Sequence, residues 1–182
     1  AERLAAPIRP GVDLPKLSVA REVGPVMGFI GREWKRKGLP RVLEMLRAMP
    51  AARLVIAGVP RKEIARLLEG LEERVELLGW IDDPNDFYQR IRLLIHPAKL
   101  EAYGMVVAEA LARRIPVLVS EATGASADMG AAGRALPHTV PVQPWAAAAR
   151  EMLAQPPEAF PPIRSWAEVA EEYHLLYQGL TL

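Results

Sequence analysis

The chain has 182 residues, of which 51% are hydrophobic and 25% charged, as in an ordinary soluble domain with a single core. Its 23 basic residues nearly balance 22 acidic ones, which argues against a nucleic-acid partner, and the lack of cysteine excludes disulfides and thiolate metal sites. No apolar run approaches the ~20 residues that span a bilayer and no secretory segment is visible, so we expect a cytoplasmic protein.

Short apolar runs alternate with amphipathic stretches over the first two thirds of the chain. Apolar residues between the runs recur at the three-four spacing of helices. Apolar strands that alternate with helices indicate a parallel sheet covered on both faces. The sequence therefore predicts an α/β fold, a doubly wound parallel sheet in a single domain. The expected strands are 26–30, 53–57, 75–78, 93–95 and 116–119, and the expected helices are 39–49, 60–71, 85–91 and 103–113.

The pattern weakens after residue 120. Residues 121–134 are interpreted as a loop with at most a short helix, 137–144 as a proline-punctuated connection and 145–153 as a helix. The last segment predicts an amphipathic helix with an aromatic and apolar stripe. This stripe needs a surface to cover, either inside the chain or outside it. Its members are Trp166, Val169, Ala170, Tyr173, Leu176, Tyr177 and Leu180.

A cationic segment follows the first strand. Sheets of this kind bind ligands beyond the carboxyl ends of their strands. Between Gly31 and Gly38, four of six side chains are cationic. Arg32 offers a bidentate fork and Lys37 a point charge, so both are candidates for binding an anion. The alternative is a solvated, positively charged helix start, but cations there oppose the helix dipole unless a phosphate neutralises them, and we favour the anion site.

Glycines also follow the second and third strands, at Gly58 and Gly79, where they let a ligand approach the backbone closely. Trp80 comes next, and because tryptophan more often packs than stacks on a base, we expect it to pack. The histidines have no acids at ligand spacing, so we expect structural roles for them and no metal site. They are His96, His138 and His174.

Two glutamates, Glu101 and Glu109, bracket Gly104 after the fourth strand. Gly104 is expected to open a helix whose first amides point toward the same sheet edge as the cationic segment. A carboxylate among apolar residues needs hydrogen-bond donors, which the hydroxyls of a sugar or a ribose supply. The alternatives are a solvent-facing loop acid at Glu101 and, at Glu109, an exposed position or an ion pair with Arg113. The amides are those of Gly104, Met105 and Val106.

Four motifs follow one another in a characteristic order, and together they resemble a known family. They are Pro10–Asp13, the pair Gly31-Arg32 with Lys37-Gly38, the stretch Glu101–Glu109, and a final helix from Ser165-Trp166. In this order they resemble the interdomain motif, the diphosphate-binding arginine and lysine, the E-x7-E signature and the crossover helix of one family. The chain resembles the C-terminal, donor-binding half of a retaining GT-B glycosyltransferase of the family-four group. It is similar in particular to lipopolysaccharide core glucosyltransferases.

The resemblance implies a role for each candidate residue. Arg32 and Lys37, with the helix amides, would neutralise the diphosphate of a donor. Glu101 would bind the hydroxyls of the donor sugar, and Glu109 those of the ribose. The backbone around Ile81 would meet the base. No metal or other cofactor is expected, because cations and a helix dipole stabilise the charge.

The resemblance also implies an organisation and a reaction. Residues 1–20 would be the interdomain linker, 21–164 the sugar-nucleotide-binding domain and 165–182 the crossover helix. The reaction would move a hexose, UDP-linked in the family's typical donor, to a hydroxyl of a lipid-linked or glycan acceptor during surface-glycan synthesis. The acceptor-binding N-terminal half, which would touch the inner membrane, is missing, and the chain begins at Ala1. We therefore expect an excised piece that binds donor but turns over little.

Two alternatives stay open beside this interpretation. The chain could be a non-catalytic nucleotide-sugar-binding module, or a fragment of a GT-B-related epimerase or phosphorylase. The sequence also departs from the family pattern in two places. Arg113–Ile115 precedes Pro116 where the family has a small residue and glycine, and the loop Gly124–Asp128 lacks the usual paired glycines. Both departures bear on the sugar-proximal loop and hence on donor identity.

Overall fold

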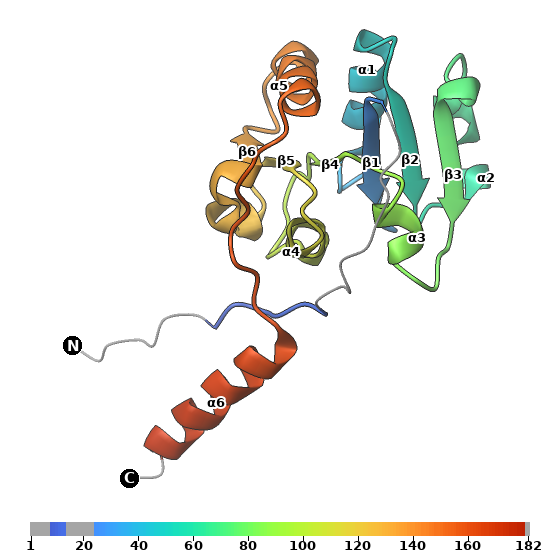
Figure 1. The fold of residues 1–182 in the computed structure, drawn as a ribbon. Helices are drawn as coiled ribbons and strands as arrows, with labels where there is room; N and C mark the ends of the chain where they lie inside the picture. The colour runs from blue at the N-terminus through green and yellow to red at the C-terminus, as the bar shows by residue number, and fades with distance from the viewer. Residues whose placement is uncertain (1–7, 14–23, 181–182) are drawn as a thin grey trace.

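The apolar segments of the chain form one parallel sheet, and the amphipathic stretches cover it (Figure 1). The structure is a computed structural model that describes residues 8–13 and 24–180. Neighbouring strands are parallel throughout, in the order β3-β2-β1-β4-β5-β6. The strands are β1 (Val26–Ile30), β2 (Arg53–Ala57), β3 (Val75–Gly79), β4 (Leu93–His96), β5 (Val117–Ser120) and β6 (Gly133–Leu136). The expected doubly wound α/β fold is confirmed. The strand order changes direction between β1 and β4, where such sheets bind ligands.

Both faces of the sheet are buried under helices. One core cluster lies between the sheet and the pair α1 and α5, and the other between the sheet and the pair α3 and α4. Because side chains alternate along a strand, the neighbours Leu93 and Leu94 of β4 belong to opposite clusters, and both are fully buried. The helices are α1 (Leu39–Ala48), α2 (Arg61–Ile64), α3 (Asn85–Tyr88), α4 (Met105–Ala112), α5 (Val142–Ala154) and α6 (Trp166–Leu180).

The five expected strands are all present, each within one residue of its predicted bounds at either end. The sixth strand, β6, was not predicted, and its first two residues fall in the stretch 121–134 interpreted as a loop. It pairs with β5 over Val117↔Gly133 to Ser120↔Leu136, and its residues are only half-buried. An edge strand of glycine, arginine, alanine and leucine carries no apolar run, so its pairing comes from β5 and not from its own composition.

Three helix predictions need correction. The helix expected over 85–91 ends at Tyr88, so it does not carry Ile91. The helix expected over 60–71 is a short α2 followed by a 3-10 turn over Ala65–Leu68, although its apolar residues are largely buried as expected. Helix α5 begins at Val142, inside the stretch predicted to be a connection. Pro144 is the third residue of this helix, where the backbone N–H has no intrahelical partner, so proline is tolerated there.

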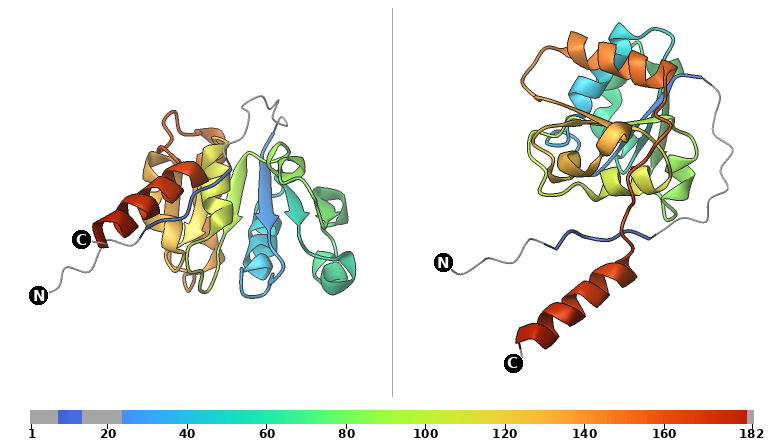
Figure 2. Two further views of the ribbon diagram at one scale, coloured as in Figure 1. Left: turned by 90° about the horizontal axis from the view of Figure 1, so that it is seen from below. Right: turned by 60° about the vertical axis from the view of Figure 1, so that its left-hand side comes forward.

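The final helix α6 forms as predicted but projects away from the sheet (Figures 1 and 2). Just before the helix, Val12 donates its N–H to Arg164 O at 2.9 Å, and within the first turn of α6 Val169 is buried. The apolar stripe beyond it is exposed, so its covering surface is not among the described residues. Its large exposed members are Trp166, Tyr173, Leu176 and Tyr177, and Leu175 beside the stripe is exposed as well.

Residues 1–7 and 14–20 of the predicted linker lie outside the described residues, as do residues 21–23 of the predicted domain. The described part includes Arg9, which forms an ion pair with Asp128 in the loop after β5. The hydroxyl of Tyr103 lies 3.5 Å from the same carboxylate. No helix in the described ranges is long and apolar enough to cross a membrane.

Candidate functional site

The cationic segment forms a tight turn between β1 and α1. Gly31 has a φ of 149°, and a Cβ atom there would lie 2.5 Å from Cδ of Lys37. Only glycine therefore lets the lysine side chain lie across the strand end. The side chain of Arg32 is exposed and forms neither a hydrogen bond nor an ion pair with the described part of the chain, so it is available to a ligand.

Arg36, which sequence reasoning did not single out, connects this turn to the loop after β4. Its Nε donates to Glu33 Oε2 at 3.0 Å, and its guanidinium also donates to the carbonyl of Leu100. In return, the N–H of Lys99 donates to Arg36 O at 3.0 Å. The donors of Arg36 are thus largely occupied within the protein. Its role is to hold the two loops together at the switch point of the sheet.

Glu101 lies where these loops meet. Its backbone N–H donates to Ala122 O at 3.0 Å, and its carbonyl accepts from the N–H of Gly124 at 3.1 Å, so the backbone is fixed to the loop after β5. The side chain is only 16% exposed, so Glu101 is not the solvent-facing loop acid of the alternative interpretation. Its Oε2 lies 3.8 Å from Nζ of Lys37 and 3.7 Å from the guanidinium of Arg36. The structure thus places predicted anion-binding and sugar-binding residues together.

His96 also faces this carboxylate. It ends β4, is 1% exposed, and its Nε2 lies 3.6 Å from Glu101 Oε2. Burial, with the charges of Lys37 and Arg36, lowers the pKa of His96 from 6.5 to about 3, so the imidazole is neutral near pH 7. One signal for this residue was present in the sequence and was passed over: the histidine stands at the carboxyl end of a strand, directly before Pro97.

Gly104 opens the helix as expected, with Met105 as the first residue of α4. It adopts a left-handed conformation with a φ of 93°, and a Cβ atom there would lie 2.8 Å from Cγ2 of Thr123. Glycine thus lets the first turn of α4 pack directly against the loop after β5. The free amides at this helix start, including that of Val106, lie at the carboxyl edge of the sheet because α4 follows β4.

Glu109 is held by a residue that the sequence did not single out. The hydroxyl of Tyr88 in α3 donates to Glu109 Oε2 at 2.7 Å. Burial, and next the charge of Glu109, raises the pKa of Tyr88 well above its ordinary value, so the phenol keeps its proton and can donate. Arg113 donates to the backbone carbonyl of Glu109 at 3.0 Å and lies over the Tyr88 ring.

A cavity of about 740 Å³ opens beside the cationic turn. Trp80 forms part of its wall and is 72% exposed, so the expectation that this residue packs is wrong. The tryptophan follows the edge strand β3, and little of its ring is covered by the described chain. The lining as described does not include six of the predicted site residues: Ile81, Glu101, Gly104, Met105, Val106 and Glu109. It consists of Arg32, Glu33, Arg36, Lys37, Gly58, Pro60, Glu63 and Trp80.

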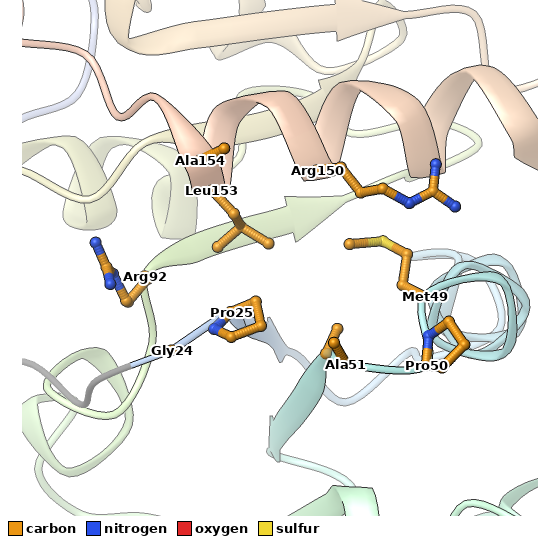
Figure 3. A pocket seen from close by; sticks show the side chains of 10 residues that line it. Gly24, Pro25, Met49, Pro50, Ala51, Arg92, Arg150, Leu153 and Ala154 are labelled. Carbon is orange, nitrogen blue, oxygen red and sulfur yellow. The ribbon is translucent and has the colours of Figure 1, made fainter.

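A second hollow, of about 370 Å³, lies at the opposite edge of the sheet, where strands begin (Figure 3). Met49 at the end of α1 and Ala154 at the end of α5 line it, so the negative ends of two helices point there. Arg150 on its rim donates to Ala48 O at 2.8 Å. This hollow therefore does not suit an anion. In the described chain, no group of three or more acids and histidines could hold a metal ion.

Residues 24–155 match the family described as Glycosyl transferases group 1. The match covers more than half of the chain. The chain belongs to this family. All six strands, the cationic turn and both signature glutamates fall within the matched range of this glycosyltransferase domain.

Relatives of known structure or function agree with the family. The lipopolysaccharide glucosyltransferase WaaG of Escherichia coli K12 is 29% identical over 159 residues, which cover 79% of this chain and 40% of WaaG. Sucrose-phosphate synthase of Thermosynechococcus elongatus superposes with a TM-score of 0.77 at 23% identity, over 87% of this chain and 46% of that one. Anabaena HepE, solved in complex with UDP-glucose, gives a TM-score of 0.64 at 24% identity, over 72% and 39%. The chain thus spans less than half the length of these proteins, and its fold matches GT-B glycosyltransferases.

Proposed function

We propose that this chain is the donor-binding domain of a retaining glycosyltransferase that moves a hexose from a nucleotide sugar to an acceptor hydroxyl in surface-glycan synthesis. One observation carries the proposal: the cations Arg32 and Lys37 stand at the switch point of the sheet, with Lys37 3.8 Å from the partly buried Glu101. Such an edge suits a ligand that is anionic on one side and rich in hydroxyls on the other, as a nucleotide sugar is.

Each part of a nucleotide sugar finds a matching group along this edge. The diphosphate would meet Arg32, Lys37 and the first amides of α4, so that no metal or other cofactor is needed. The sugar would meet Glu101. The ribose would meet Glu109, whose carboxylate Tyr88 already orients at 2.7 Å. UDP is the proposed nucleotide, since HepE binds UDP-glucose with a similar fold.

The base would lie near the end of β3. The sequence predicted that the base contacts the backbone of Ile81 and that Gly58 lets a ligand approach the backbone closely. The exposed indole of Trp80 adds a flat apolar surface that lines the same cavity as Gly58, and base–aromatic stacking stabilises bound nucleotides by about 1–3 kcal/mol per base.

The acceptor half would come from the remainder of the parent protein. WaaG is about two and a half times as long as the stretch matched here, and the apolar stripe of α6 has no cover among the described residues. We propose that an N-terminal acceptor-binding domain packs against this helix and receives a lipid-linked or glycan acceptor. The isolated chain should therefore bind the donor with little turnover. Efficient transfer by this chain alone would contradict the proposal that a second domain completes the active site.

Calorimetry with UDP and GDP tests the donor site directly. We expect UDP to bind and Lys37→Ala to weaken it by about tenfold or more, the scale of a charge-assisted hydrogen bond. Lys62→Ala is the matched control, because Lys62 is an exposed lysine on α2 that does not line the cavity. Equal affinities for all three proteins would sink the proposed site. Binding with no turnover in a reconstituted parent enzyme would favour a non-catalytic module instead.

A further inference from the structure

Two polar atoms at the centre of the site are buried without a hydrogen bond. Nε2 of His96 and Oε2 of Glu101 are both inaccessible to water, and neither has a hydrogen-bond partner in the described part of the chain. They face each other at 3.6 Å. A buried polar atom without a partner is unfavourable, so a pair of them left at the donor edge calls for an explanation.

The backbone holds both residues in place. His96 is paired with Val119 in the ladder between β4 and β5. Glu101 forms a parallel bridge with Thr123 in the loop that follows β5. Both residues are tied to the same neighbouring segment, which fixes their backbones relative to each other.

The two oxygens of Glu101 are in different surroundings. Oε2 is buried against His96, yet the side chain of Glu101 as a whole is 16% exposed. Oε1 is therefore the oxygen left for a ligand. The orientation of the carboxylate decides whether this second oxygen points at the donor sugar.

We propose that His96 is a positioning residue for Glu101: its Nε2–H donates to Oε2 and so holds Oε1 toward the hydroxyls of the donor sugar. The inference rests on the proposed function, because it requires a nucleotide sugar in the cavity beside Lys37. It adds a residue that does not itself touch the ligand but decides how well the carboxylate receives it.

The other neighbours of Glu101 cannot do this once a donor is bound. A diphosphate would attract Lys37, which lies 3.8 Å from Glu101, and the donors of Arg36 at 3.7 Å are largely occupied by Glu33 and the carbonyl of Leu100. A neutral imidazole has no such attraction to phosphate. His96 is therefore the partner of Glu101 that stays in place in the occupied site.

Donor analogues that each lack one hydroxyl of glucose give a direct test. Calorimetry on the 182-residue chain would compare UDP, UDP-glucose and UDP-glucose analogues deoxygenated at one position. For the unaltered chain we expect at least one deoxygenated donor to bind about tenfold more weakly than UDP-glucose. In His96→Phe that discrimination should shrink toward onefold, while the affinity for UDP itself changes less than about twofold.

Two further variants separate positioning from folding. His96→Gln keeps a side-chain N–H and should restore part of the discrimination. In a Glu101→Ala background, His96→Phe should have no further effect, since nothing is left to position. Far-ultraviolet circular dichroism and thermal midpoints check that each variant is folded.

The outcomes are distinguishable from those of the proposed function. Unchanged hydroxyl discrimination in a folded His96→Phe overturns the positioning role alone, as does an equal loss of affinity for UDP and UDP-glucose. A full effect of His96→Phe in the Glu101→Ala background overturns it as well. Failure of the unaltered chain to bind UDP or GDP at all overturns the donor site, and this inference with it.

Discussion

The two edges of the sheet both carry arginines beside a hollow, but they use them differently. At the edge where strands begin, Arg150 donates to Ala48 O at 2.8 Å, and Arg74 donates to Leu46 O and Met49 O at 2.9 and 3.0 Å. All three carbonyls belong to the last turn of α1 and its C-cap. These cations donate to the carbonyls at the negative end of a helix and stabilise it.

At the opposite edge the cations lie beside helix starts instead. Gly38 precedes α1 and Gly104 precedes α4, so the positive ends of both helices point there. Arg32 and Lys37 add charge of the same sign and, in the described chain, their side chains form no hydrogen bond to each other or to the protein. Helix polarity in a parallel α/β fold thus makes one edge suitable for arginine caps and the other for an anionic ligand.

Removing cations at each edge should have opposite consequences, and this is the largest effect we expect. Arg32→Ala with Lys37→Ala should weaken UDP binding about 100-fold or more, with the free energy of unfolding changed little, because Arg32 has no side-chain partner among the described residues and Lys37 gives up only an ion pair with Glu101 at 3.8 Å. Arg150→Ala should leave UDP affinity unchanged and lower the free energy of unfolding by about 1 kcal/mol. Calorimetry and urea unfolding measure the two quantities. If Arg150→Ala weakened UDP as much as the double variant, the contrast between the edges would be lost.

A pair of glycine variants sharpens the contrast at the level of the backbone. Gly104 and Gly70 both have left-handed backbones, with φ of 93° and 74°, but only at Gly104 would an added Cβ atom have a close neighbour, Thr123 Cγ2 at 2.8 Å. Gly70→Ala should lower the free energy of unfolding by about 1 kcal/mol through backbone strain alone. Gly104→Ala should lower it by about 2–3 kcal/mol, because the helix start must also move away from the loop after β5. Urea unfolding of both variants checks this, and equal losses would show that the contact with Thr123 is unimportant.

The sequence predicted the parts of the fold that are encoded locally. Strands such as β2 and β5 are buried on both faces, so an apolar run marks each of them. Strand β6 was missed, because its pairing depends on β5. Trp80 was wrongly expected to pack, because the general tendency of tryptophan takes no account of the thin cover at the edge strand β3.

For the candidate site, too, some features could be predicted from the sequence and others could not. That Arg32 and Glu101 share an edge could be predicted, since both follow strands of a parallel sheet whose carboxyl ends must coincide. The contacts of His96 with Glu101 and of Tyr88 with Glu109 could not. Each depends on how a loop or helix packs across several elements, and no spacing in the chain encodes such a distance.

The exposed tryptophan offers a smaller test of the edge where ligands are proposed to bind. Trp80→Ala should weaken UDP about tenfold, with the free energy of unfolding nearly unchanged, because the ring covers little of the protein. Trp80→Phe should lose less, since a smaller ring still stacks. Leu100→Ala is the control: its side chain is 68% exposed and does not line the cavity. Calorimetry gives the affinities, and an undiminished affinity in Trp80→Ala would place the base elsewhere.

The smallest expected effect is on the pH dependence of the free energy of unfolding, which should report that His96 at this edge resists protonation. His96 has a pKa of about 3 because of burial and the charges of Lys37 and Arg36. The unfolded chain binds this proton with a pKa of about 6.5, so the free energy of unfolding should fall as the pH drops from about 6.5 toward 3, by at most about 1.4 kcal/mol per unit, with no change above that range.

His96→Gln removes this titration, and the carboxylates, which titrate in both proteins, cancel in the comparison. Between about pH 7.5 and 5.5 the unaltered chain should therefore lose about 1 kcal/mol more than the variant in urea unfolding. Parallel pH profiles would mean that His96 titrates in the folded protein as it does in the unfolded chain, so that burial and the charges of Lys37 and Arg36 do not lower its pKa.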